Sequence, residues 1–411
     1  MLTTEAVEIL PVYREELIHE LSSILDYWIK YTPDRKQGGF IGSIDNDNRV
    51  DETAPKGVVL NSRILWTFSA AYQYEAKPVY REMADKAYRY IVDHFIDRKY
   101  GGVYWSVDCM GNRLDTRKQI YGLAFCIYGL AEYYKISGDT MALHLAKDIY
   151  GKIEQYSFDK EKGGYYEAFT QGWKVTDDLR LSAKDDNEKK TMNTHLHIIE
   201  AYANLYSVWA DEKLKDNIRH LLAVFDKYII NPQTRHLNLF MNENWQMRSS
   251  LISYGHDIEA TWLLPECAAI INDDAYTGRF RKISIQLADA AVEGLDKDGG
   301  LWYEYEPGKD HWIKEKHSWP QAEAMVGFFH AYRVTGEEKY LQYSLDVWEF
   351  VKKHIKDTGK GEWFWGVHED HSPMNKEKAG FWKCPYHNSR ACMELIKRIA
   401  ALNSKDAYKN D

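Results

Sequence analysis

Several features that would mark particular classes of protein are scarce or missing in this sequence. Its 411 residues include only five cysteines (Cys109, Cys126, Cys267, Cys384 and Cys392), too few and too widely spaced for a disulfide framework. It has no run of 18 apolar residues, so no membrane-spanning helix is expected. Lysine and arginine number 53 against 62 acidic residues, and the net charge of −9 argues against nucleic acid as a partner.

Motifs of several enzyme classes are missing as well. The chain contains no phosphate-binding P-loop, no dinucleotide-binding glycine motif, no G-x-S-x-G elbow and no H-E-x-x-H zinc motif. Its first residues, MLTTEAVEIL, include acidic side chains and lack the basic-then-apolar pattern of a secretory signal, so a cytoplasmic protein is expected. No linker rich in proline, glycine or serine divides the chain, which predicts a single domain over residues 1–411.

The chain does contain a short sequence motif that recurs six times. A glycine pair followed by alternating aromatic and polar residues occurs at residues 37–45, 100–108, 162–170 and 298–306, with weaker copies at 235–243 and 361–369. Four of the five intervals between aligned copies are 62–64 residues long, and the third is 72 residues. Such alternation is typical of a short strand or hairpin, with the glycines in the turn. The spacing therefore predicts six repeated units.

Two kinds of helix are expected between these motifs. The first in each interval is apolar nearly all round, which indicates a buried helix. These helices are expected at residues 60–72, 121–134, 195–206, 257–271, 322–332 and 388–402. The second kind has charges on one face only, which indicates a half-exposed helix. Examples are expected at residues 80–97, 141–158, 213–230 and 340–355.

Six buried helices alternating with six half-exposed helices predict an all-α fold. The arrangement is that of an (α/α)6 barrel, an inner ring of helices within an outer ring, with short β-hairpins between helices. An open α-solenoid is the alternative. Solenoids usually end in polar capping repeats, whereas both terminal units here keep the apolar inner helix, so a closed barrel is favoured.

The inner helices should all begin at the same end of the barrel, because each follows the same kind of hairpin. Polar and aromatic side chains that are unusual in buried helices gather at these helix starts, which predicts a binding site at one mouth. They are Asn61, Arg63, Lys118, Tyr121, Asn193, His197, Glu200, His256, Asp257, Glu259, Trp262, Trp319, Gln321, Glu323, Trp382, Tyr386, His387 and Arg390.

Some of these residues also fit plainer roles. Asp257 could merely cap its helix. Glu200, three residues after His197, could orient that histidine, but an ordinary helical ion pair is the favoured interpretation. Arg63 could equally pair with a buried carboxylate, so its place in the chain does not by itself assign it to a substrate.

Two other kinds of site are weighed from the same residues. Cys384, His387 and Cys392 lack the paired spacing of a zinc site, so no metal is expected. Glu259 and Glu323 could instead serve as the acid and base of an inverting glycoside hydrolase.

Four stretches of the chain resemble sequences of one known enzyme group. They are NTHLHIIEAY from Asn193, SYGHDIEATWLL from Ser253, QAEAMVGF from Gln321 and WKCPYHNSRACME from Trp382. The chain resembles the N-acylglucosamine 2-epimerase superfamily, in particular its cellobiose 2-epimerase branch, from Lys56 nearly to the C-terminus. The resemblance implies an (α/α)6 barrel that inverts C2 of a reducing glucose-type or mannose-type sugar, with no metal or nucleotide cofactor.

The resemblance also implies roles for individual residues. His256 and His387 match the acid/base pair of the family, and His197 matches a histidine held to assist ring opening or to hydrogen-bond the sugar. Residues at positions that contact, orient or stack against substrate are Arg63, Asn193, Glu259, Trp262, Trp319 and Trp382. The clustering at the helix starts adds Tyr121, Glu323 and Arg390 to the expected substrate-binding set.

Inversion at C2 explains why two histidines are needed. After the sugar ring opens to the aldehyde, one imidazole removes the C2 proton and leaves a cis-enediolate, whose charge Arg63 can stabilise. Inversion then requires a proton from the opposite face, which one fixed base cannot reach. An unperturbed histidine pKa of ~6.5 suits both donating and accepting a proton near neutral pH.

The sequence leaves the substrate open. The cellobiose branch usually has two adjacent tryptophans before V-Q-A-E, whereas this chain has Ser318, Trp319 and Pro320 before Gln321. Losing one stacking surface would weaken binding of a second sugar ring, so cellobiose, mannobiose and free mannose or glucose are all candidates. The expected partner is a small sugar, with neither nucleic acid nor membrane, and the chain is expected to act as a monomer or homodimer.

Three other functions stay open at this point. An aldose–ketose isomerase converting mannose to fructose would form the same enediolate but return the proton to C1. An inverting glycoside hydrolase would cleave a glycosidic bond without taking up solvent deuterium at C2. A sugar-binding barrel would bind an aldose without turning it over.

Overall fold

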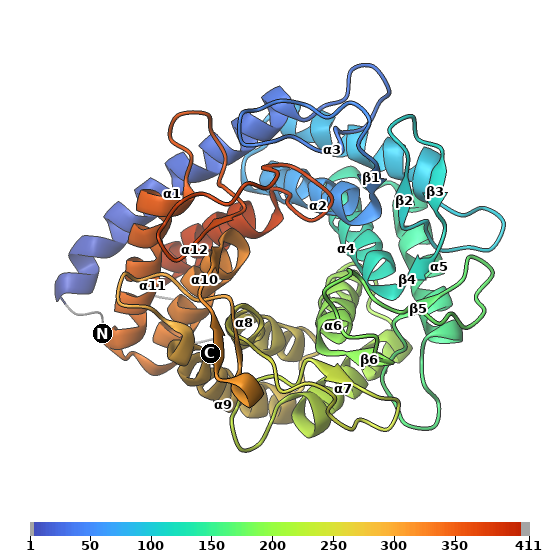
Figure 1. Ribbon diagram of the computed structural model, residues 1–411. Helices are drawn as coiled ribbons and strands as arrows, with labels where there is room; N and C mark the ends of the chain where they lie inside the picture. The colour runs from blue at the N-terminus through green and yellow to red at the C-terminus, as the bar shows by residue number, and fades with distance from the viewer. Residues whose placement is uncertain (1–3, 404–411) are drawn as a thin grey trace.

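The computed structural model describes residues 4–403, and in this range twelve α-helices form two concentric rings (Figure 1). The inner ring consists of α2 (Val58–Tyr74), α4 (Ile120–Ser137), α6 (Met192–Tyr206), α8 (Tyr254–Ile270), α10 (Ser318–Thr335) and α12 (Tyr386–Asn403). The outer ring consists of α1 (Thr4–Tyr31), α3 (Pro78–Tyr90), α5 (Thr140–Tyr156), α7 (Glu212–Val224), α9 (Asp274–Ala291) and α11 (Glu338–Phe350).

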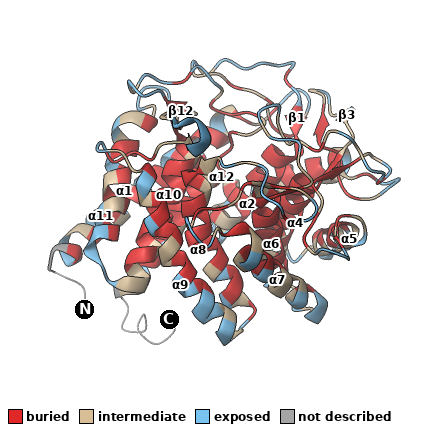
Figure 2. Cartoon of the chain, turned by 60° about the horizontal axis from the view of Figure 1, so that its bottom comes forward, coloured by how far each residue is buried: buried red, intermediate tan, exposed pale blue. Residues whose placement is uncertain are grey.

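The inner helices are buried on nearly every side, as their composition predicts. In α4 every residue from Ile120 to Tyr133 is buried, whereas α3 buries one face and exposes the other. Figure 2 shows the buried residues along the inner ring and the connecting loops gathered at one end of the barrel. None of the helices described is long and apolar enough to cross a membrane.

The inner ring is closed. Each inner helix packs against the next around the ring, and α12 packs against α2, so the last unit meets the first. This closure distinguishes a barrel from an open solenoid, and the predicted (α/α)6 fold is confirmed. The sequence prediction located four of the outer helices, and α1 and α9 complete the outer ring.

Short strands join neighbouring units at one end of the barrel. They are β1 (Lys56–Gly57), β2 (Ser106–Val107), β3 (Arg113–Asp115), β4 (Lys118–Gln119), β5 (Ala168–Phe169), β6 (Lys190–Thr191), β7 (Phe240–Met241), β8 (Ile252–Ser253), β9 (Glu304–Glu306), β10 (His311–Ile313), β11 (Lys316–His317) and β12 (Gly366–Val367). The strand before an inner helix pairs antiparallel with the hairpin of the next unit, as in Lys56 opposite Val107 and Lys118 opposite Phe169. The pairing fixes where each inner helix starts.

A buried ion pair anchors most of the hairpins. Lys118 Nζ lies 2.7 Å from Asp97 Oδ2, and both side chains are fully buried. The same lysine–aspartate pairing recurs in four other units, as Lys56–Asp34, Lys190–Asp159, Lys316–Asp296 and Lys378–Asp357. The aspartate also accepts backbone N–H groups of its own turn, which fixes the shape of the turn.

The fourth unit uses a different anchor. Asn231 stands where the other hairpins have aspartate, and Ile252 stands where they have lysine. Asp257 takes over, since its carboxylate accepts from the Leu237 backbone N–H at 2.9 Å and lies 2.7 Å from His236 Nδ1. Asp257 therefore holds a hairpin rather than capping its helix.

Three more residues of the predicted mouth cluster are also structural. Lys118 lies under its hairpin, paired with Asp97. The Gln321 amide bonds both the N–H and the carbonyl of Leu301, at 2.7 and 2.8 Å, and the Asn61 amide donates to the Gly57 carbonyl at 2.8 Å. These polar side chains secure the loops around the mouth instead of facing a ligand.

Candidate active site

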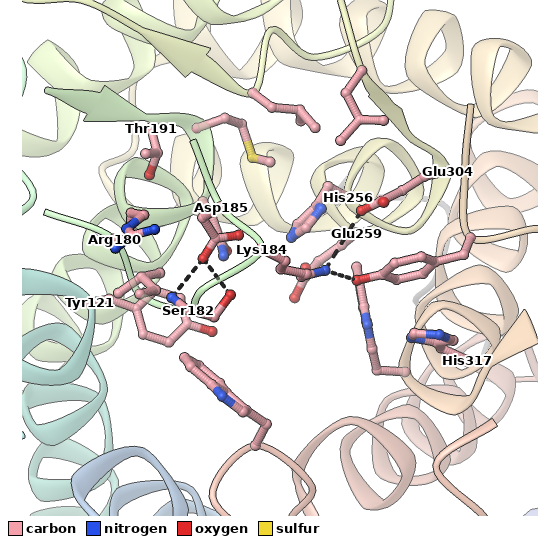
Figure 3. Close-up of a pocket in the computed structure, with 18 of the residues that line it drawn as sticks. Tyr121, Arg180, Ser182, Lys184, Asp185, Thr191, His256, Glu259, Glu304 and His317 are labelled. Atoms are coloured by element: carbon pink, nitrogen blue, oxygen red, sulfur yellow. Dashed lines mark hydrogen bonds and ion pairs between the residues drawn. The ribbon is translucent and has the colours of Figure 1, made fainter. Parts of the chain in front are cut away.

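A cavity of about 780 Å³ lies at the hairpin end of the barrel, where the inner helices begin (Figure 3). Of the twelve predicted site residues, nine line it: Arg63, Tyr121, Asn193, His197, His256, Glu259, Trp319, Trp382 and His387. The other three, Trp262, Glu323 and Arg390, are almost fully buried and lie behind the cavity wall. The structure therefore separates residues that can touch a ligand from residues that support them.

Four histidines line the cavity, and three of them, His197, His256 and His387, have their Nδ1 atom held by the protein, whereas His317 is held through Nε2 by Glu315. His197 Nδ1 lies 2.8 Å from Glu200 Oε2, and His387 Nδ1 lies 2.6 Å from Glu323 Oε1. His256 Nδ1 lies 2.7 Å from Ser253 Oγ. Because the hydrogen bond at one ring nitrogen determines what the other can do, Nε2 is left as the nitrogen that can exchange protons with a ligand.

The rings of His256 and His387 both lie next to the indole of Trp319. The Trp319 ring centroid is 4.7 Å from that of His256 and 5.6 Å from that of His387. The two histidines belong to α8 and α12, which are separated around the ring by α10, the helix that carries Trp319. Two imidazoles on separate helices thus meet in one cavity, which is the arrangement that a two-base reaction needs.

Burial controls the protonation of these histidines. It lowers the pKa of His256 and of His387 well below the usual range, and for His387 the charges of Arg63 and Arg390 act in the same direction. Burial also lowers the pKa of His197, although the hydrogen bond that its ring donates to Glu200 opposes this shift. All three are therefore neutral near pH 7 in the free enzyme and can accept a proton.

Arg390 connects the groups behind the histidines. Its Nη2 atom lies 3.0 Å from Glu259 Oε1 and 2.7 Å from Glu323 Oε1, and its Nη1 atom donates to Glu200. Trp262 Nε1 donates to the other oxygen of Glu323 at 2.9 Å. The carboxylate behind His387 thus has two donors of its own, which fixes its position.

Arg390 lowers the pKa of all three buried carboxylates, but the balance against burial and neighbouring charges differs among them. Burial by itself would raise the pKa of Glu200, but Arg390 and His197 lower it to about 2. Burial raises the pKa of Glu259, and the neighbouring Glu323 raises it further. Glu200 is therefore ionised, and its link to His197 is a buried, orienting hydrogen bond rather than the ordinary helical ion pair that the sequence favoured.

Arg63 supplies a cation at the cavity wall. It is buried, its Nη2 atom donates to Tyr121 Oη at 2.8 Å, and its guanidinium lies over the Phe125 ring at 4.2 Å. Its Nε atom and Asn193 Oδ1 are buried without hydrogen-bond partners among the described residues. An unpaired buried donor and acceptor beside one cavity can be satisfied by the hydroxyl or carbonyl groups of a ligand.

Sequence reasoning missed one long stretch of the cavity wall. Residues 179–186 and Glu188 line the cavity, and Lys184 Nζ donates to Tyr303 Oη and lies 3.9 Å from Glu304 (Figure 3). This segment belongs to the third unit, whose repeat interval is longer than the others. The extra length was the available signal, but its lack of periodicity gave no indication of where it folds.

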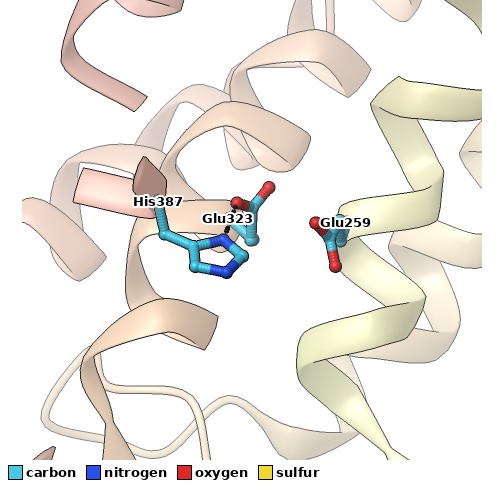
Figure 4. A group of neighbouring side chains, drawn as sticks. All are labelled: Glu259, Glu323 and His387. Carbon is cyan, nitrogen blue, oxygen red and sulfur yellow. Dashed lines mark hydrogen bonds and ion pairs between the residues drawn. The ribbon is translucent and has the colours of Figure 1, made fainter. Parts of the chain in front are cut away.

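The structure also bears on the alternative metal and hydrolase sites. Among residues 4–403, the one group of possible ligand atoms within 4.8 Å of one another belongs to Glu259, Glu323 and His387 (Figure 4). Cys384 and Cys392 take no part in it. Arg390 already bridges the two carboxylates, whose oxygen atoms lie within 4.8 Å of each other, closer than the roughly 6.5–9.5 Å separation of an inverting hydrolase pair.

Comparison with known proteins assigns this chain to a family. Residues 39–391 match the model of the N-acylglucosamine 2-epimerase (GlcNAc 2-epimerase) family. The chain belongs to the N-acylglucosamine 2-epimerase family. It is accordingly a carbohydrate epimerase, and the expectation drawn from the sequence resemblance is confirmed at this level.

Relatives within the family are similar over almost their whole length. The chain is 46% identical to a cellobiose 2-epimerase of Bacteroides fragilis, covering 94% of this chain and 99% of the relative. It superposes with a TM-score of 0.92 on the structure of cellobiose 2-epimerase from Spirochaeta thermophila, 38% identical and covering 98% of this chain and 100% of the other. A D-mannose isomerase of Marinomonas mediterranea is more distant, 24% identical over 88% of this chain and 92% of its own.

Proposed function

We propose that this epimerase inverts C2 of a reducing glucose-type or mannose-type sugar by transferring protons between the sugar and two histidines. The observation that carries the proposal is the placement of His256 and His387 in one cavity, beside the same Trp319 indole. Both are neutral near pH 7, so either can act as the base.

The reaction proceeds through an enediolate. One imidazole takes the C2 proton, and the electron pair of the C2–H bond forms the C1–C2 double bond. Negative charge develops on the sugar oxygens, and the Arg63 guanidinium stabilises it. This stabilisation is strong because Arg63 is buried. The other imidazole, which takes up a proton from solvent before this step, then delivers it to the opposite face of C2, where the electron pair of the C1–C2 double bond forms the new C2–H bond. The first imidazole returns its proton to solvent, so the enzyme ends as it began.

His197 has a supporting role in this scheme. Glu200 accepts from its Nδ1, so its Nε2 atom presents a lone pair to the cavity. There it can accept the proton of the anomeric hydroxyl as the sugar ring opens. Asn193, whose side-chain oxygen is unpaired, is on the same helix and can accept a sugar hydroxyl.

We infer that the preferred substrate is a β-linked disaccharide such as cellobiose. The cavity is large for a single sugar and falls within the roughly 300–1,000 Å³ of pockets that enclose drug-sized ligands. The relatives at 46% and 38% identity are named cellobiose 2-epimerases, whereas the mannose isomerase is 24% identical. Ser318 lines the cavity where the cellobiose branch usually has a second tryptophan, so free mannose is retained as a second substrate to test.

One NMR experiment tests both statements. The enzyme is incubated in D2O with cellobiose, mannobiose and mannose in parallel, and product identity and deuterium position are read together. Epimerisation predicts the C2 epimer with deuterium at C2, whereas isomerisation predicts fructose-type products. Cleavage to monosaccharides, or binding without turnover, would overturn the proposal.

A further inference from the structure

The residue before α8, Ser253, is of a type that commonly caps helices but does not cap this one. At the equivalent position of α6, Thr191 Oγ1 accepts from the Thr194 backbone N–H at 3.2 Å, an ordinary helix cap. Ser253 is the residue type preferred for the same role, but its side chain makes no cap hydrogen bond. Its Oγ atom lies instead 2.7 Å from Nδ1 of His256, three residues further on.

This diverted hydroxyl completes a pattern among the cavity histidines. His197 and His387 have carboxylates, Glu200 and Glu323, at Nδ1, and a carboxylate fixes the hydrogen on that nitrogen because it accepts hydrogen bonds. His256 has only the neutral hydroxyl of Ser253 in that place. Ser253 is itself buried, so no open water competes for the contact.

We propose that Ser253 is a positioning residue that accepts the Nδ1–H of His256 and thereby aims Nε2 at C2 of the sugar. The inference rests on the proposed 2-epimerase function. With this tautomer His256 can take a proton when neutral and give it back when charged, while Nδ1 keeps its hydrogen throughout.

The difference between a hydroxyl and a carboxylate has a chemical consequence. When His256 removes the C2 proton, the C2–H pair enters the enediolate, the proton binds Nε2, and the ring becomes a cation without a fixed negative partner. When His387 does the same, Glu323 faces the new cation at Nδ1. Protonated His256 therefore releases its proton more readily than protonated His387, because Ser253 offers its Nδ1–H a neutral acceptor instead of a carboxylate.

Two substitutions separate positioning from folding. Ser253→Ala removes the hydroxyl and is expected to lower kcat roughly 10–100-fold, less than the loss of about 10⁴ seen when a charged orienting group is removed from a catalytic triad. KM should stay within about twofold. Ser253→Thr keeps a hydroxyl and should restore kcat to within about threefold of the wild type.

A spectroscopic readout makes the test independent of turnover. Ring-¹⁵N-labelled histidine, with His256 assigned through its absence in His256→Asn, should report hydrogen on Nδ1 in the wild type and in Ser253→Thr. In Ser253→Ala both tautomers should be populated. Asp211→Ala, which removes the side-chain cap of the outer helix α7, serves as the matched control and should lower Tm while leaving kcat and the His256 signals unchanged.

The outcomes decide between the two proposals. An unchanged His256 tautomer in Ser253→Ala, or a Ser253→Thr variant as impaired as Ser253→Ala, would overturn the role of Ser253. If the wild-type enzyme placed no deuterium at C2 of any sugar, the proposed function would fail, and the tautomer signals recorded without sugar would still test the role of Ser253.

Discussion

Three imidazoles at the mouth of this barrel each keep one ring nitrogen engaged by the protein and leave the other to the ligand. Two of the engaging groups, Glu200 and Glu323, are in turn held by Arg390, and Trp262 also donates to Glu323; neither Arg390 nor Trp262 lines the cavity. Two of the proposed catalytic imidazoles, His197 and His387, are therefore oriented by carboxylates whose own positions are set by residues behind the cavity wall.

Replacing either proposed base should nearly abolish inversion. His256→Asn and His387→Asn are each expected to lower turnover roughly 10²–10⁴-fold, the usual contribution of a general acid–base group. Epimer formation measured by ¹H NMR checks this. His144→Asn, at an exposed histidine of α5, should behave as the wild type. Wild-type turnover in either active-site variant would rule out the two-base scheme.

The same variants should retain half of the reaction. Each leaves one base in place, so each should still exchange the C2 proton of one epimer with solvent without inverting it. His256→Asn and His387→Asn should favour opposite epimers, because the two bases face opposite sides of C2. Deuterium uptake into recovered substrate, followed separately for the two epimers, is the measurement. Exchange of the same epimer by both variants would contradict this arrangement.

The sequence could reveal the role of a residue only where that role follows from its position within its own helix. The histidines, Arg63 and Asn193 could be found because they sit at helix starts, where polar groups are out of place in a buried helix. The role of Glu200 could not, since it depends on Arg390, 190 positions away in the chain. Ser253 could not either, since its role depends on the contact between its hydroxyl and the His256 ring, which the sequence does not show.

At the scale of elements, hairpins and helix starts are held by buried charge pairs. A buried pair contributes little to stability compared with an apolar replacement, but leaving one member alone is costly. Five units of the barrel use lysine and aspartate, and the fourth replaces both and recruits His236 and Asp257. The partners were changed together, which is what the cost of an unpaired buried charge would require.

Removing one partner of the Lys118–Asp97 pair should be strongly destabilising. Lys118→Met is expected to lower the free energy of unfolding by about 3–5 kcal/mol, because the carboxylate stays buried without its cation. Adding Asp97→Asn should recover part of the loss. Urea unfolding measures both, and Arg279→Met, which breaks an exposed pair with Asp226, should cost under about 1 kcal/mol. Strict additivity of the two Lys118 and Asp97 changes would contradict the coupling.

A second element-scale prediction concerns acid stability. Burial lowers the pKa of His195 to about 3, and its Nε2 atom accepts the Tyr165 backbone N–H at 2.9 Å. The unfolded chain binds this proton near pH 6.5, so the contribution of neutral His195 is complete above that pH and is lost as pH falls toward 3. Urea unfolding between pH 7.5 and 4.5 should show a shallower pH dependence in His195→Gln than in the wild type. An identical dependence would contradict this assignment.

At the scale of the molecule, the first and last repeat units pack against each other. Trp28 of α1 donates to Glu362, Trp363 donates to Glu20 of α1 at 2.7 Å, and α12 packs against both α1 and α2. The first and last units are therefore neighbours, and no unit is left with an exposed inner face.

Ring closure predicts a single cooperative unfolding transition. Since every inner helix is packed on both sides, losing one unit exposes apolar surface on two others. Far-ultraviolet circular dichroism and tryptophan fluorescence should give coincident urea transitions, as expected for one domain over residues 1–411. Two separated transitions would show that the chain divides into independently folding parts.

The whole-molecule architecture was predictable because it repeats. Six motifs at nearly equal spacing gave the number of units, and the apolar inner helices gave the order of the rings. No range was predicted for α9, although Phe280, Ile283, Leu287 and Ala291 form a buried stripe at helical spacing within Asp274–Ala291, so the signal was present in the sequence. The segment of residues 179–188 was missed because its place over the mouth depends on contacts with Tyr303 and Glu304 in another unit.

The separate hairpins have a practical consequence for enzyme engineering. Each contributes one sector of the rim, and five of the six are anchored by a lysine–aspartate pair beneath them. The longer third unit adds residues 179–186 and Glu188 to the cavity wall and still has its own Lys190–Asp159 anchor. Grafted loops that retain the lysine and aspartate at their base should therefore retune sugar choice one sector at a time, without redesigning the scaffold.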